Sequence, residues 1–411
     1  MILYDIALVA GQAAVVFVVS TTIFDILHYL LHRWEASRSR LLRAFSRMHW
    51  VHHRFLNLEM QIDPAYRWQN IWCHVVPEYV TSMAGTLAFL LIFPWPPVAI
   101  IAALRTWYLL STLKEEGMDF NHMSMDRVSA RQGLWWVDAN YHAMHHLFPN
   151  QFFSSFANVF DLLFGTACQI EGRTFIVTGA SGAFGKAMSA RIIRKGGEVR
   201  ALKSGRDFGP GDYDRAREAL EWADVLILAH GAKTADCWDA NYVTFVDLID
   251  LFIEVGKNRV LPPEIWALGS EAELHGDFGQ EDMKDYVASK RAFAARARGY
   301  YANPMVIYRH IVPSAFTSAM GRGLMSADTA AAIAIFFIRR AFRYVPVTYT
   351  TLAFWNYFRF KRQPNSDSSS ALASNVESSN AAETTFGAKR TRVRNSEASQ
   401  APNHGSSSRR C

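Results

Sequence analysis

Apolar residues are distributed unevenly along this chain of 411 residues. An apolar run over residues 3–27 is as long as the roughly 20 residues that cross a bilayer core, and a second apolar block covers residues 75–113. The prolines at Pro94, Pro96 and Pro97 interrupt the second block, which predicts two helices of about 17 residues joined by a tight turn. A cleaved signal peptide is the alternative for the first run, but no basic segment precedes it and no small-residue cleavage site ends it. We therefore expect membrane helices within a domain covering residues 1–171.

The pattern changes near residue 172, where the short apolar runs FIVTG, EVRAL and ADVLILAHG alternate with helical segments. Alternating strands and helices predict a Rossmann-type α/β domain with a parallel sheet over residues 172–345. Residues 333–362 then combine many aromatic residues with six basic residues and no acidic one. They suit either the last helix and strand of the α/β domain or an anchor at a membrane interface, and the two interpretations are compatible. We assign the interface segment to residues 346–362 and predict a disordered tail over 363–411, where apolar periodicity ends.

Composition and charge indicate which kinds of binding partner to expect. Half of the residues are hydrophobic (50%), 19% are charged and the formal net charge is +6. The basic residues flank apolar helices and occupy the tail, so anionic lipid headgroups are expected as partners and nucleic acid is not. The four cysteines form no CxxC pair, which excludes a zinc ribbon and favours a reducing compartment. Arginines between the apolar blocks place that segment in the cytoplasm, and the hairpin returns later residues to the same side. The expectation is an integral, multi-pass membrane protein with cytoplasmic active sites.

Histidines are concentrated in the first part of the chain, where ten of the fourteen precede residue 147. Eight of them form three groups. In the first, the pair lies at i and i+4 on one helix face, and the other two groups have an HxxHH pattern that places two imidazoles on a shared face. These groups are His28 and His32, then His49, His52 and His53, then His142, His145 and His146.

So many imidazoles predict a metal centre. Imidazole suits iron, zinc and copper, and eight nitrogens are too many for one four-coordinate ion. With no thiolates and few carboxylates nearby, the sequence predicts two metal ions held by nitrogen ligands at the membrane surface. Two iron ions could activate O₂ to attack an unactivated C–H bond, which side chains alone cannot do. A structural zinc site is the alternative.

A dinucleotide site is predicted by TFIVTGASGAFG, which leads from a strand into a helix. Its glycines Gly179, Gly182 and Gly185 would permit a tight turn and close approach of the backbone to a pyrophosphate at a helix N-terminus. At the end of the next strand stand Lys203 and Arg206, where an acidic residue would bind the ribose of NAD. Basic residues at this position favour the 2′-phosphate of NADP(H).

A proton-exchange site is predicted further along the chain. In DYVASK, Tyr286 and Lys290 lie four residues apart, one above the other on a helix. An adjacent ammonium lowers the pKa of a phenol, so the tyrosine could exchange a proton with a substrate oxygen. Ser270, at the end of the strand EIWALGS, could hydrogen-bond the same oxygen.

The segments HYLLHR, HWVHH, YHAMHH and NVFDLLFGT resemble the membrane-bound fatty acid hydroxylase/sterol desaturase superfamily, including the plant aldehyde decarbonylases of wax biosynthesis, over residues 20–170. The resemblance implies a di-iron oxygenase in which His122 of FNHMSMD joins the ligands, with His74 as a further candidate. Family members commonly carry a second histidine four residues after the one in "HR", but this chain has Ala36 there. Three alternatives are open: His28 substitutes for it, Glu35 does, or one iron is under-ligated and the oxygenase is impaired. No HPGG segment is present, so electrons must come from a separate electron-transfer protein.

The order glycine turn, serine, tyrosine and lysine resembles the short-chain dehydrogenase/reductase family over residues 172–345. The resemblance makes Ser270, Tyr286 and Lys290 catalytic, with Asn241 of ANYVTF completing a proton relay. It also implies that the cofactor-binding residues are Thr178, Gly179, Ser181, Gly182, Gly185, Lys203, Arg206, Gly231, Pro313 and Thr317. Two departures stand out: Ala229-His230-Gly231 replaces the family's Asn-Ala-Gly, and the region that should hold the third strand is compressed.

Together the two halves predict a bifunctional lipid-modifying oxidoreductase, similar to fused desaturase/short-chain dehydrogenase proteins. One half would hydroxylate or desaturate a sterol or fatty-acyl lipid with O₂, and the other would interconvert alcohol and carbonyl with NADP(H). Fusion would raise the local concentration of a poorly soluble intermediate. Two alternatives remain open at this point: aldehyde decarbonylation to an alkane, and a short-chain dehydrogenase whose membrane domain is an inactive scaffold.

Overall fold

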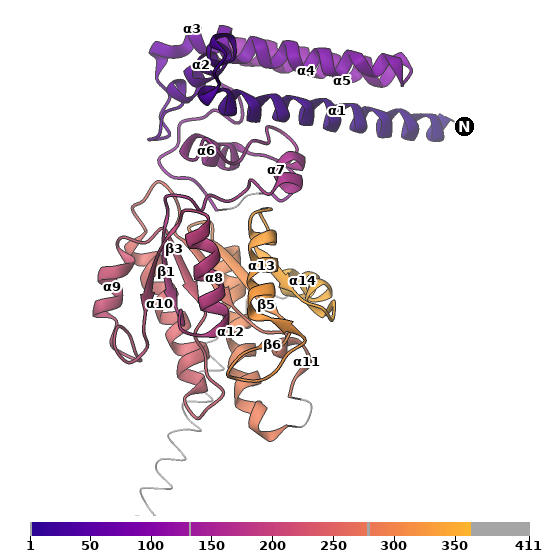
Figure 1. The fold of residues 1–411 in the computed structure, drawn as a ribbon. Helices are drawn as coiled ribbons and strands as arrows, with labels where there is room; N and C mark the ends of the chain where they lie inside the picture. Colours follow the sequence, from indigo (N-terminus) through magenta and orange to yellow (C-terminus); the bar gives the residue numbers. More distant parts are fainter. Residues whose placement is uncertain (1, 131–132, 278–279, 363–411) are drawn as a thin grey trace, which may run out of the picture. The chain divides into compact units, whose positions relative to one another are not determined.

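The computed structural model describes residues 2–130, 133–277 and 280–362, shown as a ribbon in Figure 1. The tail expected to be disordered, residues 363–411, lies outside the described residues. The first part of the chain is helical and the second is an α/β domain, as the apolar pattern predicts.

Three long helical segments lie side by side at the start of the chain (Figure 1). They are α1 (Ile2–Arg33), the α4 segment (Val76–Ala88) and α5 (Trp95–Lys114). The expected turn between two helices occurs at Ile92–Pro94, because a proline can begin a helix but cannot continue one. The shorter helical segments are η1 (Trp34–Ala36), α2 (Arg40–Phe55), η2 (Pro64–Tyr66), α3 (Arg67–Asn70), the π-helix η3 (Ile71–Val75), η4 (Phe89–Leu91), α6 (Ala139–Leu147) and α7 (Val159–Phe164).

Two helices of the described residues are long and apolar enough to cross a bilayer, Tyr4–Ala36 and Trp95–Lys114. The helix α4, which we expected to be the other arm of a membrane hairpin, does not meet that criterion. It is only 13 residues long and carries Glu78, Ser82 and Thr86, which lower its hydropathy. The multi-pass arrangement therefore stays a prediction.

The second part of the chain is built on a six-stranded sheet with the order β2-β1-β3-β4-β5-β8, in which all neighbouring strands are parallel. The strand β3 is buried throughout, as a strand covered by helices on both faces must be. The strands are β1 (Thr174–Thr178), β2 (Glu198–Leu202), β3 (Val225–Leu228), β4 (Glu264–Leu268), β5 (Ile307–Pro313) and β8 (Tyr344–Val347), with β6 (Phe316–Thr317) and β7 (Met325–Ser326) forming a small separate pair. This is the Rossmann-type parallel sheet that the sequence predicts.

Helices cover both faces of the sheet and divide its core into two apolar clusters. One cluster contains side chains from α9, α10 and α12, and the other contains side chains from α8 and α13. The helices are α8 (Ala183–Arg194), α9 (Asp214–Leu220), the π-helix η5 (Asp239–Val243), α10 (Thr244–Val255), α11 (Ala272–His275), η6 (Glu281–Met283), α12 (Lys284–Ala302), α13 (Ala327–Ile338) and α14 (Leu352–Arg362). Chain order reverses at β1, which has β2 on one side and β3 on the other, and ligands of such sheets bind at this crevice.

The compressed region noted in the sequence lies after β2. Residues 203–213 form a loop with two isolated bridges, Ser204 to Phe208 and Gly209 to Asp212, and the chain then returns through α9 to β3 beside β1. Across the described residues 198–228, no strand pairs with the outer edge of β2. The last strand, β8, extends to Val347, so residues 346–347 belong to the sheet and the aromatic-basic segment contributes α14 beyond it.

Candidate functional site

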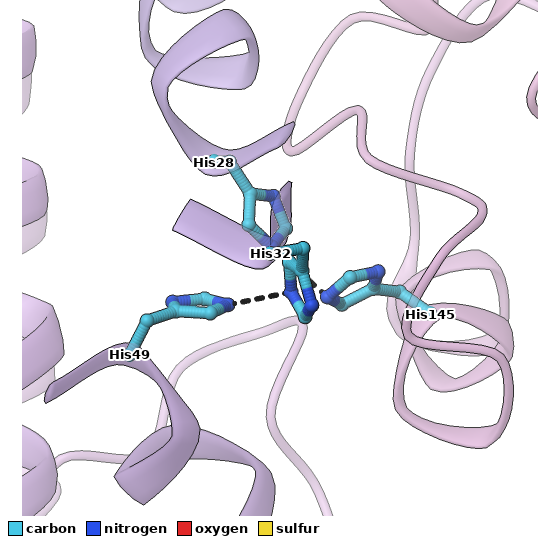
Figure 2. A group of neighbouring side chains, drawn as sticks. All are labelled: His28, His32, His49 and His145. Carbon is cyan, nitrogen blue, oxygen red and sulfur yellow. Dashed lines mark hydrogen bonds between the residues drawn. The ribbon is translucent and has the colours of Figure 1, made fainter. Parts of the chain in front are cut away.

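The predicted histidines converge on two neighbouring groups of four buried imidazoles, in each of which the nitrogen donors lie within 4.8 Å of one another. The residues come from α1, α2, α6 and the loop after α5, so helices distant in sequence must pack to form each group. Figure 2 shows the first group with its rings directed toward a common centre. The first group is His28, His32, His49 and His145, and the second is His52, His122, His142 and His146.

The separations between ring nitrogens match those of ligands around a metal ion. In the first group, Nε2 of His28 lies 2.9 Å from Nε2 of His145, and the corresponding distance from His32 to His49 is 2.9 Å. In the second, Nε2 distances from His52 to His122 and His142 are 3.3 and 3.4 Å, and the His142–His146 distance is 3.3 Å. Two nitrogens each about 2.1 Å from a shared ion are about 3.0 Å apart at a right angle and about 3.4 Å apart at a tetrahedral angle.

Backbone carbonyls fix the protonation of the His28–His145 pair. Nδ1 of His28 lies 3.0 Å from the carbonyl oxygen of Phe153, and Nδ1 of His145 lies 2.8 Å from that of Gln151. A carbonyl can only accept, so both Nδ1 atoms carry the hydrogen. Burial lowers the pKa of His145 well below its usual value, which favours a neutral ring. The two Nε2 lone pairs therefore face each other at 2.9 Å, an arrangement that a cation between them would stabilise.

The second group is oriented in a similar way. Nδ1 of His146 lies 2.8 Å from the carbonyl oxygen of Leu56, and Nδ1 of His122 lies 2.8 Å from a carboxylate oxygen of Asp119. The same oxygen of Asp119 accepts from the backbone N–H groups of Asn121 and His122, which holds it in place. Carboxylate or carbonyl partners on the outer nitrogen are typical of histidines that bind metals, because they direct the lone pair of the other nitrogen inward. The donor set therefore fits metal ions.

Asp161 of the NVFDLLFGT motif supports the first group from behind, a role the sequence did not reveal. Its buried carboxylate accepts from the backbone N–H groups of Phe153 (3.0 Å) and Ser154 (2.9 Å) and from the hydroxyl of Tyr141 (2.8 Å). The first of these bonds fixes the residue whose carbonyl orients His28. The presence of Asp161 in a recognised motif was the only signal that could have identified it.

Two of the candidate histidines stand outside both groups. His53 has its Nε2 3.3 Å from Nε2 of His32, and its ring centroid lies 4.8 Å from that of His145 and 4.7 Å from that of His146. It therefore lies between the groups and could serve either. His74, in the π-helix η3, stacks on His52 with ring centroids 3.8 Å apart and directs its Nε2 toward Glu78 at 3.4 Å.

The positions of His28 and Glu35 show which of them lies where the histidine missing at Ala36 was expected to contribute. Of the two substitutes that we considered, His28 is a member of the first group, whereas Glu35 is exposed and outside it. His28 and His32 are one turn apart on α1, so their side chains reach the same centre.

The α/β domain has two adjoining cavities at the carboxyl ends of its central strands, and both are lined by Ala229, His230 and Gly231. The larger, about 510 Å³, is lined also by the glycine turn after β1, including Gly179, Ser181 and Gly182, and by Lys203. The smaller, about 200 Å³, contains Asn241, Ser270, Tyr286, Lys290 and Pro313. The cavities are a cofactor-sized cleft and a substrate-sized one in contact with each other.

The glycines of the turn are required by close contacts. Gly179 has a φ of +68°, and a Cβ there would lie 2.5 Å from the backbone nitrogen of His230. A Cβ on Gly185 would overlap the carbonyl oxygen of Gly179, so this glycine lets α8 pack against the turn. Thr178 does not line either cavity. Its hydroxyl bonds to the backbone of Ile227 and to Nδ1 of His230 at 2.7 Å, so it braces the turn from inside.

Of the two basic residues predicted at the end of β2, only Lys203 lines the larger cavity. The guanidinium of Arg206 is bound at 2.8 and 2.6 Å by the carboxylate of Asp207. The same carboxylate accepts from the backbone N–H of Lys203 at 2.8 Å. An acidic residue therefore lies beside the expected 2′-phosphate position, and Arg206 would have to leave it to bind a phosphate.

The catalytic candidates line the smaller cavity together, but the pKa of Tyr286 differs from the expected direction. We expected Lys290 to lower the pKa of Tyr286, but burial raises it, although a hydrogen bond with Ser270 opposes the increase. Lys290 donates to the carbonyl of Leu268 at 3.1 Å, and burial lowers its own pKa to about 8. Asn241 lies in the π-helix η5, and its amide donates to the carbonyl of Ala232 at 2.8 Å.

Thr317, predicted to border the nicotinamide, lines neither of the two cavities. It is exposed, and its hydroxyl bonds to the carbonyl of Gly323 at 3.1 Å, while the next residue, Ser318, lines both cavities. His230 was noted only as a departure, yet its ring bridges Thr178 and the hydroxyl of Thr244 at 2.9 Å, and burial lowers its pKa to about 3. A neutral imidazole in the wall of both cavities therefore occupies the position where the resembled family has alanine.

The α/β part of the chain is a Rossmann-type parallel sheet with a glycine turn at the point where its strand order reverses. Serine, tyrosine and lysine line the adjoining cavity, an arrangement that can exchange a proton with a substrate oxygen. No protein-family model matches the chain. A curated relative is the monoglucosyldiacylglycerol epimerase of Synechocystis sp., which is 25% identical over 379 residues, covering 80% of this chain and 89% of the relative.

Solved structures resemble the α/β part of the chain. A short-chain dehydrogenase from Burkholderia cenocepacia, in complex with NADP, is 16% identical, and the match covers 47% of this chain and 96% of that one with a TM-score of 0.38. One from Sphingobium yanoikuyae, in complex with NADPH, is 17% identical over 46% of this chain and 94% of that one, with a TM-score of 0.36. The di-iron oxygenase assignment of the first part of the chain stays a prediction.

Proposed function

We propose that the protein is a membrane-bound oxidoreductase that interconverts an alcohol and a carbonyl on a lipid, using NADP(H), beside a histidine centre for two metal ions. The observation that carries the first part is the cavity shared by Ser270, Tyr286 and Lys290, which opens onto the glycine-lined cleft. NADP(H) bound in that cleft would supply or accept the hydride.

The side chains determine the course of the proton. Because its pKa is raised, the Tyr286 phenol is neutral at ordinary pH and can donate its proton to a carbonyl oxygen. Ser270 would hydrogen-bond the same oxygen, and the Lys290 ammonium would stabilise the phenolate that remains. Below about pH 8 Lys290 carries its charge, so carbonyl reduction is the direction that the cofactor-free site favours.

The histidine centre would hold two iron ions, one in each group of four imidazoles. Iron there would supply O₂-dependent oxidation of an unactivated C–H bond, with electrons from a separate protein. The chain contributes eight imidazole rings to the two groups. In four of them the outer nitrogen, Nδ1, is held by a hydrogen bond to Phe153, Gln151, Leu56 or Asp119. Few other ligand atoms are nearby, which suits iron better than a hard ion that prefers oxygen.

A lipid substrate at a membrane surface is supported by the helices of membrane-crossing length. Fewer than a third of the residues in the apolar windows of those helices are buried, and the exposed side chains include Leu8, Val15, Ile23, Leu104 and Leu110. Apolar side chains in such numbers on a helix surface are expected where lipid replaces water.

Epimerisation is the second candidate, favoured by the curated relative. Its name describes action on monoglucosyldiacylglycerol, and the match covers more of this chain than the α/β domain alone. The same site could oxidise a ring alcohol of a glycolipid and then reduce the ketone from its other face. The cofactor would return to its starting state, so the two candidates differ in net cofactor turnover.

One isotope experiment separates the candidates. The full chain in lipid nanodiscs is given NADP⁺ with glycolipids and long-chain alcohols that carry deuterium on the carbinol carbon. An alcohol dehydrogenase transfers the deuterium to the cofactor, which accumulates as NADPD with one ketone or aldehyde formed for each. An epimerase yields the inverted lipid with its deuterium retained and no reduced cofactor. If neither product forms with any of these lipids, the proposed lipid alcohol chemistry is wrong.

The metal assignment is tested independently by elemental analysis of protein purified without chelators. We expect iron at about two ions per chain, as eight converging imidazoles require. Zinc in place of iron would support the structural alternative, and no metal at all would support the inactive scaffold. The variant His275→Ala is a suitable control, because this exposed histidine lies outside both groups and its loss should leave the metal content unchanged.

A further inference from the structure

The last described helix, α14, presents aromatic side chains on its outer face. Trp355 is 74% exposed, Phe358 55% and Phe354 45%. The opposite face is fixed to the domain, because Phe360 is buried and stacks on the ring of His310 with centroids 5.1 Å apart. The helix is therefore held in place by its inner face, while Trp355 and Phe358 remain more than half exposed.

Beneath this helix lies a cavity of about 380 Å³ that the proposed function does not use. Half of its lining residues are aromatic, and its charged groups are those of Arg343 and Lys361. A cavity of this size, with apolar walls and a few polar groups, is typical of a small-ligand site. Its aromatic lining residues are Tyr301, Phe342, Tyr344, Phe354, Tyr357 and Phe358.

The surroundings of the cavity are strongly basic. From residue 329 to residue 362 the sequence has six basic residues and no acidic one. Three of them, Arg359, Lys361 and Arg362, lie in the last turn of α14. Exposed tryptophan and phenylalanine beside lysine and arginine are the residues that proteins place at the headgroup level of a bilayer. Charge complementarity therefore favours an anionic lipid surface over an apolar protein partner.

We propose that α14 and the cavity beneath it form a second lipid-binding site, which binds an anionic phospholipid of the bilayer. One acyl chain would enter the aromatic cavity, and the headgroup would pair with the basic last turn of α14. The exposed Trp355 and Phe358 would enter the interfacial region beside it. This site goes beyond the proposed function, because it shares no lining residue with either cavity of the cofactor and substrate cleft.

Photo-crosslinking of the full chain tests the proposal. The protein is reconstituted in vesicles containing phosphatidylglycerol with a diazirine in its acyl chain, irradiated and digested with trypsin. The peptide 344–359 covers the aromatic face of α14, and the peptide 218–233 provides a matched control, scored by fragmentation at Trp222 because its residues 229–231 line the cleft. That control contains Trp222, which is 75% exposed and hence as accessible as Trp355. The peptide 106–114 from α5 is the positive control for lipid contact.

We expect label on peptide 344–359 at a level near that of 106–114 and well above that of 218–233. Replacing Trp355→Gln and Phe358→Gln together should reduce the label on this peptide to the level of 218–233, with NADPH binding retained as proof of folding. The variant Lys361→Glu should reduce labelling by phosphatidylglycerol more than labelling by a phosphatidylcholine probe. Label on 344–359 no higher than on 218–233 would overturn the proposal. So would protein-to-protein crosslinks at α14 without lipid label, which would assign this face to a second copy of the chain.

Discussion

The two histidine groups and the glycine-lined cleft of the α/β domain are built on opposite principles. Every member of the two groups of four is buried, and hydrogen bonds on the outer nitrogen direct four of the eight rings, those of His28, His122, His145 and His146. In the cleft, the candidate residues line open cavities of about 510 and 200 Å³. A metal ion needs several lone pairs at fixed separations, whereas a dinucleotide needs space and a backbone that it can approach.

This difference implies that the two sites should fail independently. A side chain of the cleft can be changed without disturbing how α1, α2 and α6 hold the imidazoles, and the reverse should also be true. The largest effect is expected where one atom performs the chemistry, and smaller effects where a residue only positions or charges another.

The largest effect should come from Tyr286→Phe. Removing the phenolic proton donor should lower NADP-dependent turnover by about 10²- to 10⁴-fold, the usual contribution of general acid–base catalysis. NADPH binding and metal content should be unchanged. Steady-state kinetics, fluorescence titration and metal analysis measure turnover, NADPH binding and metal content. Tyr213→Phe is the control, because Tyr213 packs against the core next to α9 and lines neither cavity. Turnover close to that of the parent protein would show that another group donates the proton.

The reciprocal variant is His145→Ala, which removes one ligand of the first group. We expect about one of the two ions to be lost, since the remaining three imidazoles hold the metal less tightly. Turnover with NADP(H) should persist, so the two sites would be shown to be separable. Full retention of metal in His145→Ala would contradict its assignment as a direct ligand, and loss of both ions would show that the two groups are coupled.

An intermediate effect should follow Asp161→Asn, which tests whether support behind the ligands matters. An amide has a single acceptor oxygen, so it cannot accept from Phe153, Ser154 and Tyr141 as the carboxylate does. The loop that orients His28 should loosen, and metal affinity should decrease by about 10- to 100-fold. Competition with a chelator of known affinity measures the change. Asp328→Asn, at an exposed ion pair with Arg191, should have no such effect. Equal affinities in both variants would mean that Asp161 stabilises the fold alone.

Interactions between residues close in sequence could be predicted, whereas those between distant segments could not. The i and i+4 spacing of His28 and His32, and that of Tyr286 and Lys290, is local, so it identified residues that share a face. The carbonyl groups of Gln151 and Phe153 that orient His145 and His28 are backbone atoms, which every residue has. No sequence pattern could have identified them.

The structure differs from the expected placement of side chains where loops determine their direction. Thr317 and Ser318 are adjacent, and a shift of one residue decides which of them lines the cleft. Arg206 is paired with its neighbour Asp207 in this structure, so its contact with a phosphate stays a prediction. The raised pKa of Tyr286 depends on how deeply the packed domain buries the phenol, and spacing alone cannot give that quantity.

The smallest expected effect is the pH dependence of turnover, which depends on Lys290 in the cleft and not on the histidine groups. Its pKa of about 8 lies below the usual 10.5 because it is buried, so the folded chain binds fewer protons than the unfolded chain between these values. As pH rises through that window, the contribution of Lys290 to stability increases, while the site loses the ammonium that stabilises the Tyr286 phenolate. We therefore expect kcat/KM for carbonyl reduction to decrease above about pH 8, with Lys290→Arg retaining activity to higher pH because a guanidinium stays charged. Metal content measured over the same range should not follow this profile. A decline of the same midpoint in Lys290→Arg would assign the titration to another group of the cleft.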